Sequence, residues 1–219
     1  MHSYSINCNR ANIRRNIILW LFCFSIIIFT ILSQLFEIAV SAFPSVQNTI
    51  NDFMALIPWV SPVFGGLSAF SIFGIFFWTF DNFIWKVSFI QKYTTMSDFE
   101  GTWEGVLKSS YDETKEFKVI MEITQSWSRI SVVASFDESE SWSDSAHIDL
   151  THTRGSLLKF TYANRSDNPS WDIREHRGET ELFLKDYDNT TGNYTVLKGD
   201  YYNNRGKNGN VGTIYLSRK

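Results

Sequence analysis

The sequence predicts a membrane α-hairpin of two transmembrane helices followed by an all-β domain. Residues 17–36 and about 57–80 form two long apolar runs that contain no charged residue. From Phe99 onward, the chain changes to short runs in which apolar and polar residues alternate. Alternation with period two is typical of strands with one buried face. We therefore expect a cytoplasmic N-terminus and a two-helix membrane region over residues 1–92, and a cytoplasmic β-barrel over residues 93–219.

The first apolar run has about 20 residues, which matches a hydrocarbon core of roughly 30 Å at 1.5 Å per helical residue. A secretory signal peptide is the alternative, because basic residues precede the run. Apolar cores of signal peptides are shorter, however, and a second apolar run follows soon after. We therefore expect the run to span a membrane.

The distribution of basic residues predicts that both termini face the cytoplasm. Three arginines precede the first run and two lysines follow the second, whereas the loop between the runs contains no Lys or Arg. Basic residues concentrate on the cytoplasmic side of membrane proteins. These residues are Arg10, Arg14, Arg15, Lys86 and Lys92. The charge distribution therefore predicts a multi-pass membrane protein with both termini on the cytoplasmic side.

Small residues recur every four positions in the second apolar run, at Ser61, Gly65 and Ala69. Residues with this spacing lie on one face of a helix, where small side chains let another helix approach closely. The three positions therefore predict an association face. The alternative is that small residues are simply common in membrane helices.

Eight alternating segments follow. The first strand is expected within Phe99–Tyr111, where Gly101, Trp103 and Gly105 suit a tightly curved strand. Further strands are expected around Phe117–Trp127, Ile130–Phe136, Ala146–Leu150, Leu158–Tyr162, His176–Leu184, Tyr194–Tyr202 and Gly212–Arg218. Eight strands with short connections close most simply into an antiparallel up-and-down β-barrel, lipocalin-like, that can hold one small ligand. A two-sheet sandwich is the alternative.

The composition argues against several functions. Residues 93–219 contain 15 Lys and Arg against 20 Asp and Glu, a difference of −5, which does not favour binding of long nucleic acids. The two cysteines, Cys8 and Cys23, cannot form a disulfide framework in the β domain. Nucleophile-elbow, phosphate-loop and zinc-protease motifs are missing. No enzymatic activity, cofactor or metal is therefore expected.

Two minor patterns have more ordinary explanations. His147, Asp149 and His152 come closest to a metal-ligand cluster, but strand alternation puts His152 on the opposite face from the other two. Three Asn-x-Ser/Thr triplets, at Asn164, Asn189 and Asn193, would suggest glycosylation, but the charge distribution places them in the cytoplasm.

Alternation also predicts which polar and aromatic side chains point into the barrel or toward its mouth. Aromatic faces stack bases and Arg side chains suit phosphates, so the set fits a small anionic nucleotide. Core packing is the alternative for each Trp and Tyr. An internal acid such as Asp200 or Glu100 is the alternative partner for an inward Arg. The predicted ligand-binding residues are Trp103, Tyr162, Arg174, His176, Tyr201, Asn203, Arg205 and Arg218.

Nearly the whole chain resembles one family. Two membrane spans precede Gly101-Thr-Trp-Glu-Gly105, then His176-Arg-Gly178, Gly199-Asp-Tyr201, Tyr202-Asn-Asn-Arg205 and Gly212-Thr-Ile-Tyr-Leu216. This order resembles the two-transmembrane, β-strand-rich effectors of bacterial CBASS anti-phage signalling, which are associated with CD-NTase enzymes.

The resemblance implies an inner-membrane effector whose β-barrel binds a cyclic dinucleotide. A partner nucleotide synthase would make this ligand after infection, with no need for direct contact. Binding would drive self-association and disruption of the lipid bilayer, and thus abortive infection. A membrane-tethered, lipocalin-like carrier of a lipid or other apolar ligand is the alternative, and an enzyme acting at the membrane is a third.

Overall fold

The computed structural model describes all residues except 8–11, 57–59, 167–174, 191 and 207–208, and the side chains of 60–67 and 113 also lie outside the description. The chain divides into two compact units. One unit joins Met1–Asn9 with Trp85–Lys219, and the other is Arg10–Ile84. The first residues of the chain therefore fold with the β domain, although the sequence predicted only a tail there.

The Arg10–Ile84 unit contains three helices among its described residues: α1 (Ile13–Ser41), α2 (Pro44–Leu56) and α3 (Val60–Asn82). Within the described part of the chain, α1 is the helix that is long and apolar enough to cross a membrane. Helix α3 contains most of the second predicted run. The connection expected as a loop is largely helical, because α1 extends to Ser41 and Pro44 opens α2 at a position that suits proline.

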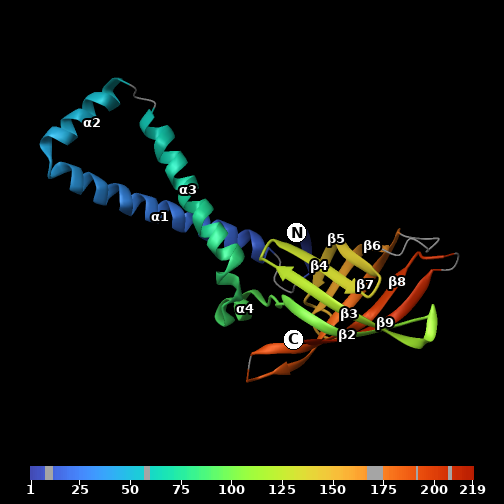
Figure 1. Cartoon of the computed structure of the whole chain (residues 1–219). Helices are drawn as coiled ribbons and strands as arrows, with labels where there is room; N and C mark the ends of the chain where they lie inside the picture. The colour runs from blue at the N-terminus through green and yellow to red at the C-terminus, as the bar shows by residue number, and fades with distance from the viewer. Residues whose placement is uncertain (8–11, 57–59, 167–174, 191, 207–208) are drawn as a thin grey trace. The chain divides into compact units, whose positions relative to one another are not determined.

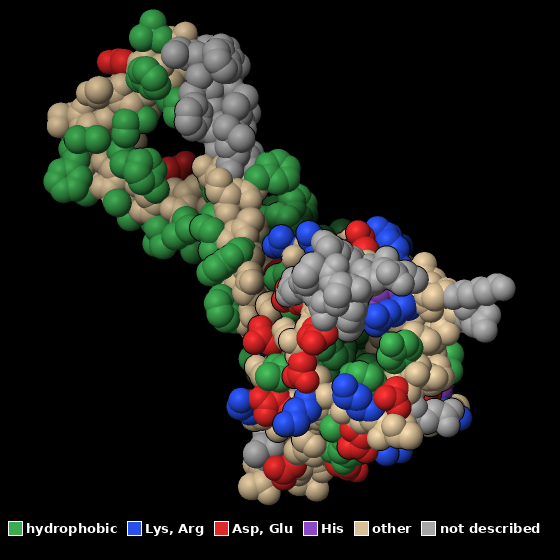
Figure 2. Space-filling view, turned by 45° about the vertical axis from the view of Figure 1, so that its right-hand side comes forward, with side chains coloured by type: hydrophobic (Ala, Val, Ile, Leu, Met, Phe, Trp, Pro, Cys, Tyr) green, Lys and Arg blue, Asp and Glu red, His purple; other side chains and the backbone are tan. Residues whose placement is uncertain are grey.

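Helices α1 and α3 pack through aromatic rings. The Phe22 ring lies 6.1 Å from the Phe70 ring and 5.8 Å from the Phe73 ring, measured between centroids. Large apolar side chains remain exposed elsewhere along α1, including Trp20, Phe36 and Ile38. Hydrophobic side chains cover the described helices of this unit, whereas the β domain presents interspersed acidic and basic side chains (Figure 2). Exposed apolar surface on this scale marks an interaction or membrane surface.

The other unit is mostly β-sheet (Figure 1). A single helical turn, η1 (Ile84–Lys86), and helix α4 (Ser88–Thr94) precede its main strands. The described strands are β1 (His2–Asn7), β2 (Gly101–Ser109), β3 (Asp112–Gln125), β4 (Arg129–Phe136), β5 (Ser139–Asp149), β6 (Leu157–Ser166), β7 (Glu175–Asp188), β8 (Asn193–Asn203) and β9 (Asn210–Arg218).

Strands β2 to β9 form an antiparallel meander that closes on itself. Each strand pairs with the next, and β2 also pairs with β9 from Trp103 opposite Arg218 to Ser109 opposite Gly212. These eight strands correspond to the eight that the sequence predicted. The prediction of an all-β antiparallel domain is therefore confirmed, and the strand pairings form a closed barrel.

Strand β1 is a ninth strand in the described sheet, and the predicted count of eight was wrong. Strands β4 and β5 pair directly only beside their turn, where Val133 lies opposite Trp142. Farther from the turn, β1 lies between them, antiparallel to β4 and parallel to β5. Tyr4 is buried, and its hydroxyl donates to the carbonyl oxygens of Ser126 and Trp127. The first residues of the chain thus complete the sheet.

One end of the barrel is filled by apolar side chains. Trp103, Leu197 and Leu216 are fully buried there, and Trp85 and Phe99 pack into the same end from the segment before β2. We call this the closed end. Both η1 and the last residue of β1 lie at the closed end, so the chain leaves the barrel there to form the Arg10–Ile84 unit and returns there from it.

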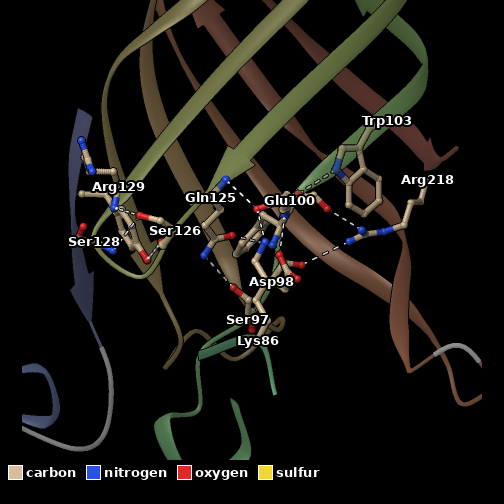
Figure 3. A network of polar contacts seen from close by, with 12 residues as sticks. Lys86, Ser97, Asp98, Glu100, Trp103, Gln125, Ser126, Ser128, Arg129 and Arg218 are labelled. Atoms are coloured by element: carbon tan, nitrogen blue, oxygen red, sulfur yellow. Dashed lines mark hydrogen bonds and ion pairs between the residues drawn. The ribbon is translucent and has the colours of Figure 1, made fainter. Parts of the chain in front are cut away.

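Polar contacts seal the closed end (Figure 3). Arg218 donates to the carbonyl oxygens of Glu100 at 2.6 Å and Tyr194 at 2.9 Å, and its guanidinium lies 4.3 Å from the centroid of the Trp103 ring. The Glu100 carboxylate pairs with Lys86 at 2.8 Å. Buried Gln125 accepts from the Phe99 backbone N–H at 2.9 Å. These bonds connect β9, β3 and the segment before β2.

The contacts of Arg218 predict a structural role. Replacing Arg218 with Met should lower the free energy of unfolding by about 1–3 kcal/mol, because the charged hydrogen bonds to the carbonyl oxygens of Asp98, Glu100 and Tyr194 are lost. Urea denaturation of the full chain, followed by tryptophan fluorescence, measures this change. The matched control is Lys219→Met, which removes only an exposed ion pair with Glu104 and should cost less than about 1 kcal/mol. Equal costs for both variants would contradict the role.

Candidate functional site

The end of the barrel opposite the closed end contains a cavity of about 370 Å³. Its lining residues come from the ends of β2 to β9 near the β2–β3, β4–β5, β6–β7 and β8–β9 connections. A volume above about 300 Å³ is in the range of small-molecule sites. The interior is therefore a cup, packed at one end and hollow at the other.

The cavity lining combines aromatic rings with polar groups. Aromatic side chains line the cavity together with hydroxyl, amide and imidazole groups, as expected for a site that must both stack and orient a ligand. The aromatic lining residues are Tyr111, Phe117, Phe136, Phe160, Tyr162 and Tyr201. The uncharged polar ones are Ser109, Ser139, Ser141, Asn164, His176, Thr180, Asn203 and Asn210.

Two glycines make room for two of these rings. A Cβ atom at Gly178 would lie 2.5 Å from the ring and hydroxyl of Tyr162, and a Cβ atom at Gly212 would lie 2.6 Å from the Tyr201 ring. Contacts this short do not occur between real side chains, so the rings can occupy these positions only because β7 and β9 carry glycine there. The positions of both tyrosine rings therefore depend on glycine at residues 178 and 212.

Both tyrosines are neutral hydrogen-bonding groups. Burial raises the pKa of Tyr162 to about 12, although a hydrogen bond with Asn203 opposes this shift. Burial also raises the pKa of Tyr201, which has a hydrogen bond with Ser109. Each ring therefore presents an apolar face and an O–H group to the cavity.

His176 is held in its neutral form. Burial, together with the nearby positive charge of Arg205, lowers the pKa of His176 to about 4. Arg205 itself lies with its guanidinium carbon 5.4 Å from the centroid of the Tyr111 ring. A bound anion between His176 and Arg205 would reverse this shift, because a negative charge favours the imidazolium form.

The ionisable residues around the cavity balance in formal charge. Three cations, Lys115, Lys118 and Arg205, are matched by Asp112, Asp137 and Glu138. Hydrogen bonds from Thr114 lower the pKa of Asp112, so this carboxylate is ionised at neutral pH. Net charge alone therefore does not select an anion, and selection must come from individual contacts.

The structure brings together five of the eight ligand-binding residues that the sequence predicted. Tyr162, His176, Tyr201, Asn203 and Arg205 all line the cavity.

The other predicted residues lie elsewhere. Trp103 and Arg218 point inward as predicted. They pack against each other at the closed end, however, and are not among the described residues that line the cavity. The Arg218 guanidinium donates to carbonyl oxygens and lies near the acidic residues Asp98 and Glu100. This arrangement agrees with the alternative that an inward Arg has an internal partner in place of a ligand. Arg174 lies outside the described residues. Of the predicted association face, Ala69 is partly buried on α3, and the side chains of Ser61 and Gly65 lie outside the description.

Sequence reasoning missed several polar lining residues, of which Asn164, Ser141 and Thr180 are the most buried. Alternation could have found Asn164, because it follows Phe160 and Tyr162 on the same face of β6. Ser141 was not assigned because no strand was predicted over residues 139–145.

The weak metal candidate has other contacts. The Nδ1 atom of His147 lies 2.8 Å from the Ser5 hydroxyl, and the Asp149 carboxylate accepts from Thr151. The His152 ring packs 4.9 Å from the Phe183 ring. Within the described part of the chain, no group of three or more His, Cys, Asp or Glu side chains is arranged to hold a metal ion.

Comparisons with known proteins show the family of the chain. The chain is 28% identical to CD-NTase-associated protein 15 from Yersinia aleksiciae over 159 residues, 71% of this chain and 72% of that protein. It is 28% identical to the protein of the same name from Staphylococcus schleiferi over 119 residues, 52% of this chain and 63% of that one. The family described as Cap15, cyclic dinucleotide receptor domain, matches residues 94–218, which is more than half of the chain. The chain therefore belongs to the Cap15 cyclic dinucleotide receptor family, and the predicted membership of a CBASS effector family is confirmed.

Proposed function

We propose that the chain is a membrane-bound CBASS effector that is activated when a cyclic dinucleotide enters the cavity of the β domain. The observation that carries this proposal is the cavity itself, which lies within the matched receptor domain and combines aromatic rings with buried hydrogen-bonding groups. Bases stack on aromatic rings, and Arg205 offers a guanidinium group to a phosphodiester.

A lipid carrier is the second candidate, because the barrel interior also contains many aliphatic residues. Leu107, Val119, Met121, Ala134 and Ile214 line the cavity as well. The hollow end differs from the closed end, however, in also presenting amide, hydroxyl and imidazole groups. Burying an alkyl chain against these groups would leave them without partners, which is costly. The cavity therefore favours a polar ligand with aromatic parts.

We further propose that Arg10–Ile84 crosses the inner membrane twice, with both termini in the cytoplasm. Strand β1 precedes this unit and β2 to β9 follow it, yet all nine strands share one sheet. Both ends of the unit must therefore lie on one side of any bilayer, which supports an even number of crossings. The length of α1 and the apolar contacts between α1 and α3 suit a helical hairpin.

Activation then requires only a difference in affinity. A ligand that binds an associated form more tightly than the single chain shifts the population toward association by that difference in free energy. Association through the face of Ser61, Gly65 and Ala69 would bring several helical hairpins together and disturb the bilayer. The β domain senses the ligand, and the helices act on the membrane.

The first test is calorimetric titration of the full chain in detergent micelles with cyclic dinucleotides and, separately, with fatty acids. Arg205→Gln should weaken cyclic dinucleotide binding about 10- to 100-fold, because a charge-assisted hydrogen bond is lost. Lys198→Gln, an exposed cation on the outer face of β8, is the matched control and should change affinity less than twofold. Tight binding of fatty acids alone would overturn the proposal.

The low pKa of His176 predicts proton uptake on binding. His176 is neutral in the free chain down to about pH 4, and a nearby phosphodiester raises its pKa toward the ordinary value. Titrations in buffers of different ionisation enthalpy should detect almost no uptake at pH 7.5 and up to about one proton at pH 5.5. His176→Gln should abolish the uptake. A wild-type chain that takes up no proton at pH 5.5 would show that the anion does not approach His176.

The association face predicts a separation of binding from toxicity. Gly65→Leu should still bind the ligand, with the affinity of the single chain, but should abolish ligand-dependent leakage of dye from proteoliposomes, because a bulky side chain prevents close helix approach. Gly74→Leu is the matched control: it lies nine residues away, on the opposite face of α3, and a Cβ atom there meets nothing within 4 Å. Leakage that persists in Gly65→Leu would refute this face.

A further inference from the structure

Asn164 on β6 has an unusual set of partners for a buried side chain. It is only 4% exposed and lines the cavity. Its Nδ2 atom donates to the Ser141 hydroxyl at 2.7 Å and to the Ser139 hydroxyl at 3.3 Å. Its Oδ1 atom is buried and has no hydrogen-bond partner. A buried acceptor without a donor is rare in folded proteins and needs an explanation.

The two serines determine which way the amide faces. Ser139 and Ser141 both lie on β5, on one side of Asn164, and together they use both N–H groups of Nδ2. The Oδ1 atom is consequently directed away from β5. Across β6, the register partner of Asn164 is His176 on β7, another residue of the cavity lining. The free acceptor thus belongs to the same wall as the proposed ligand site.

We propose that Asn164 is a base-reading residue whose Oδ1 atom accepts a hydrogen bond from an N–H group of a nucleobase. This inference rests on the proposed function and adds to it a requirement on the ligand: the base bound at this wall must present an amino or ring N–H donor. Binding would supply the hydrogen-bond donor that the Oδ1 atom lacks in the free chain. Part of the ligand's affinity would therefore come from this new hydrogen bond.

Because Oδ1 is a hydrogen-bond acceptor, the charged phosphodiester groups of the ligand cannot be its partner. A phosphodiester and a carboxylate offer only acceptors at neutral pH, so neither can satisfy a carbonyl oxygen. A base can do so, and it can also stack, since Phe160 and Tyr162 precede Asn164 on the same face of β6. Each serine hydroxyl keeps its own proton after accepting from Nδ2. This side of the cavity therefore presents the Oδ1 acceptor beside the hydroxyl donors of Ser139 and Ser141. The edge of a nucleobase, which carries both donors and acceptors, complements this pattern.

The experiment is a double-mutant cycle on the full chain in micelles. The cyclic dinucleotide that binds most tightly is compared with analogues that lack one donor: purine in place of adenine, hypoxanthine in place of guanine, or N3-methyluracil in place of uracil. For the wild-type chain, losing the donor that Asn164 reads should weaken binding about tenfold. For Asn164→Ala, the same change should weaken binding less than twofold. Arg165→Ala, an exposed residue next to Asn164 on β6, is the matched control and should retain the tenfold difference.

A second arm separates the base from the sugar. Analogues that lack the free ribose hydroxyl should weaken binding equally for the wild type and for Asn164→Ala. Coupling of Asn164 to that hydroxyl instead of to a base N–H would overturn the inference, as would equal penalties for the donor-deficient bases in both chains. If no cyclic dinucleotide binds the wild-type chain, the proposed function fails and this inference fails with it. Thermal unfolding of Asn164→Ala checks that the variant is folded.

Discussion

The pairing of β2 with β9 is the contact on which the rest of this structure depends. It joins the first and last strands of the meander and leaves no open edge between them. An open edge would expose a row of unpaired N–H and C=O groups that could recruit other chains. A glycine on each strand permits the close approach: a Cβ atom at Gly105 would lie 2.0 Å from the Tyr215 carbonyl oxygen, and one at Gly212 would lie 1.9 Å from that of Lys108.

Closure gives the interior two ends with different chemistry. At one end, aliphatic and tryptophan side chains are closely packed, and Arg218 and Gln125 pair with backbone groups. The Trp85 Nε1 atom is buried there without a hydrogen-bond partner. At the other end, the same strands carry serine, asparagine, histidine and tyrosine. The stability of the barrel therefore resides largely at the closed end, and the residues at the mouth are free to vary with the ligand.

Alternation along the strands made much of this fold predictable. It placed all eight strands of the meander, and it correctly turned Trp103, Tyr162, Tyr201 and Arg218 inward. It could not tell how deep along the barrel each side chain lies, because period two is the same at both ends. Trp103 and Arg218 were consequently grouped with the ligand-binding residues, although they lie at the closed end. Depth follows from strand register, which is determined by pairing between distant segments.

Two other differences have local causes. His2, Tyr4 and Ile6 alternate with Ser3, Ser5 and Asn7, but six residues are a weak signal, and the partners of β1 lie more than a hundred residues away. Helix α2 was expected as a loop because its residues lie between the two apolar runs that were predicted to span a membrane. Asn164 was missed because the fifth strand was predicted to end at Tyr162.

Insertion of β1 between β4 and β5 constrains how the protein is made. Strand β1 can find its place in the sheet only after Arg129 and Asp149 have been synthesised. By then, the helical unit that lies between β1 and β4 in the sequence has also been synthesised. Such long sequence separation slows folding. Assembly of the barrel thus joins a strand that precedes the helical unit to strands that follow it.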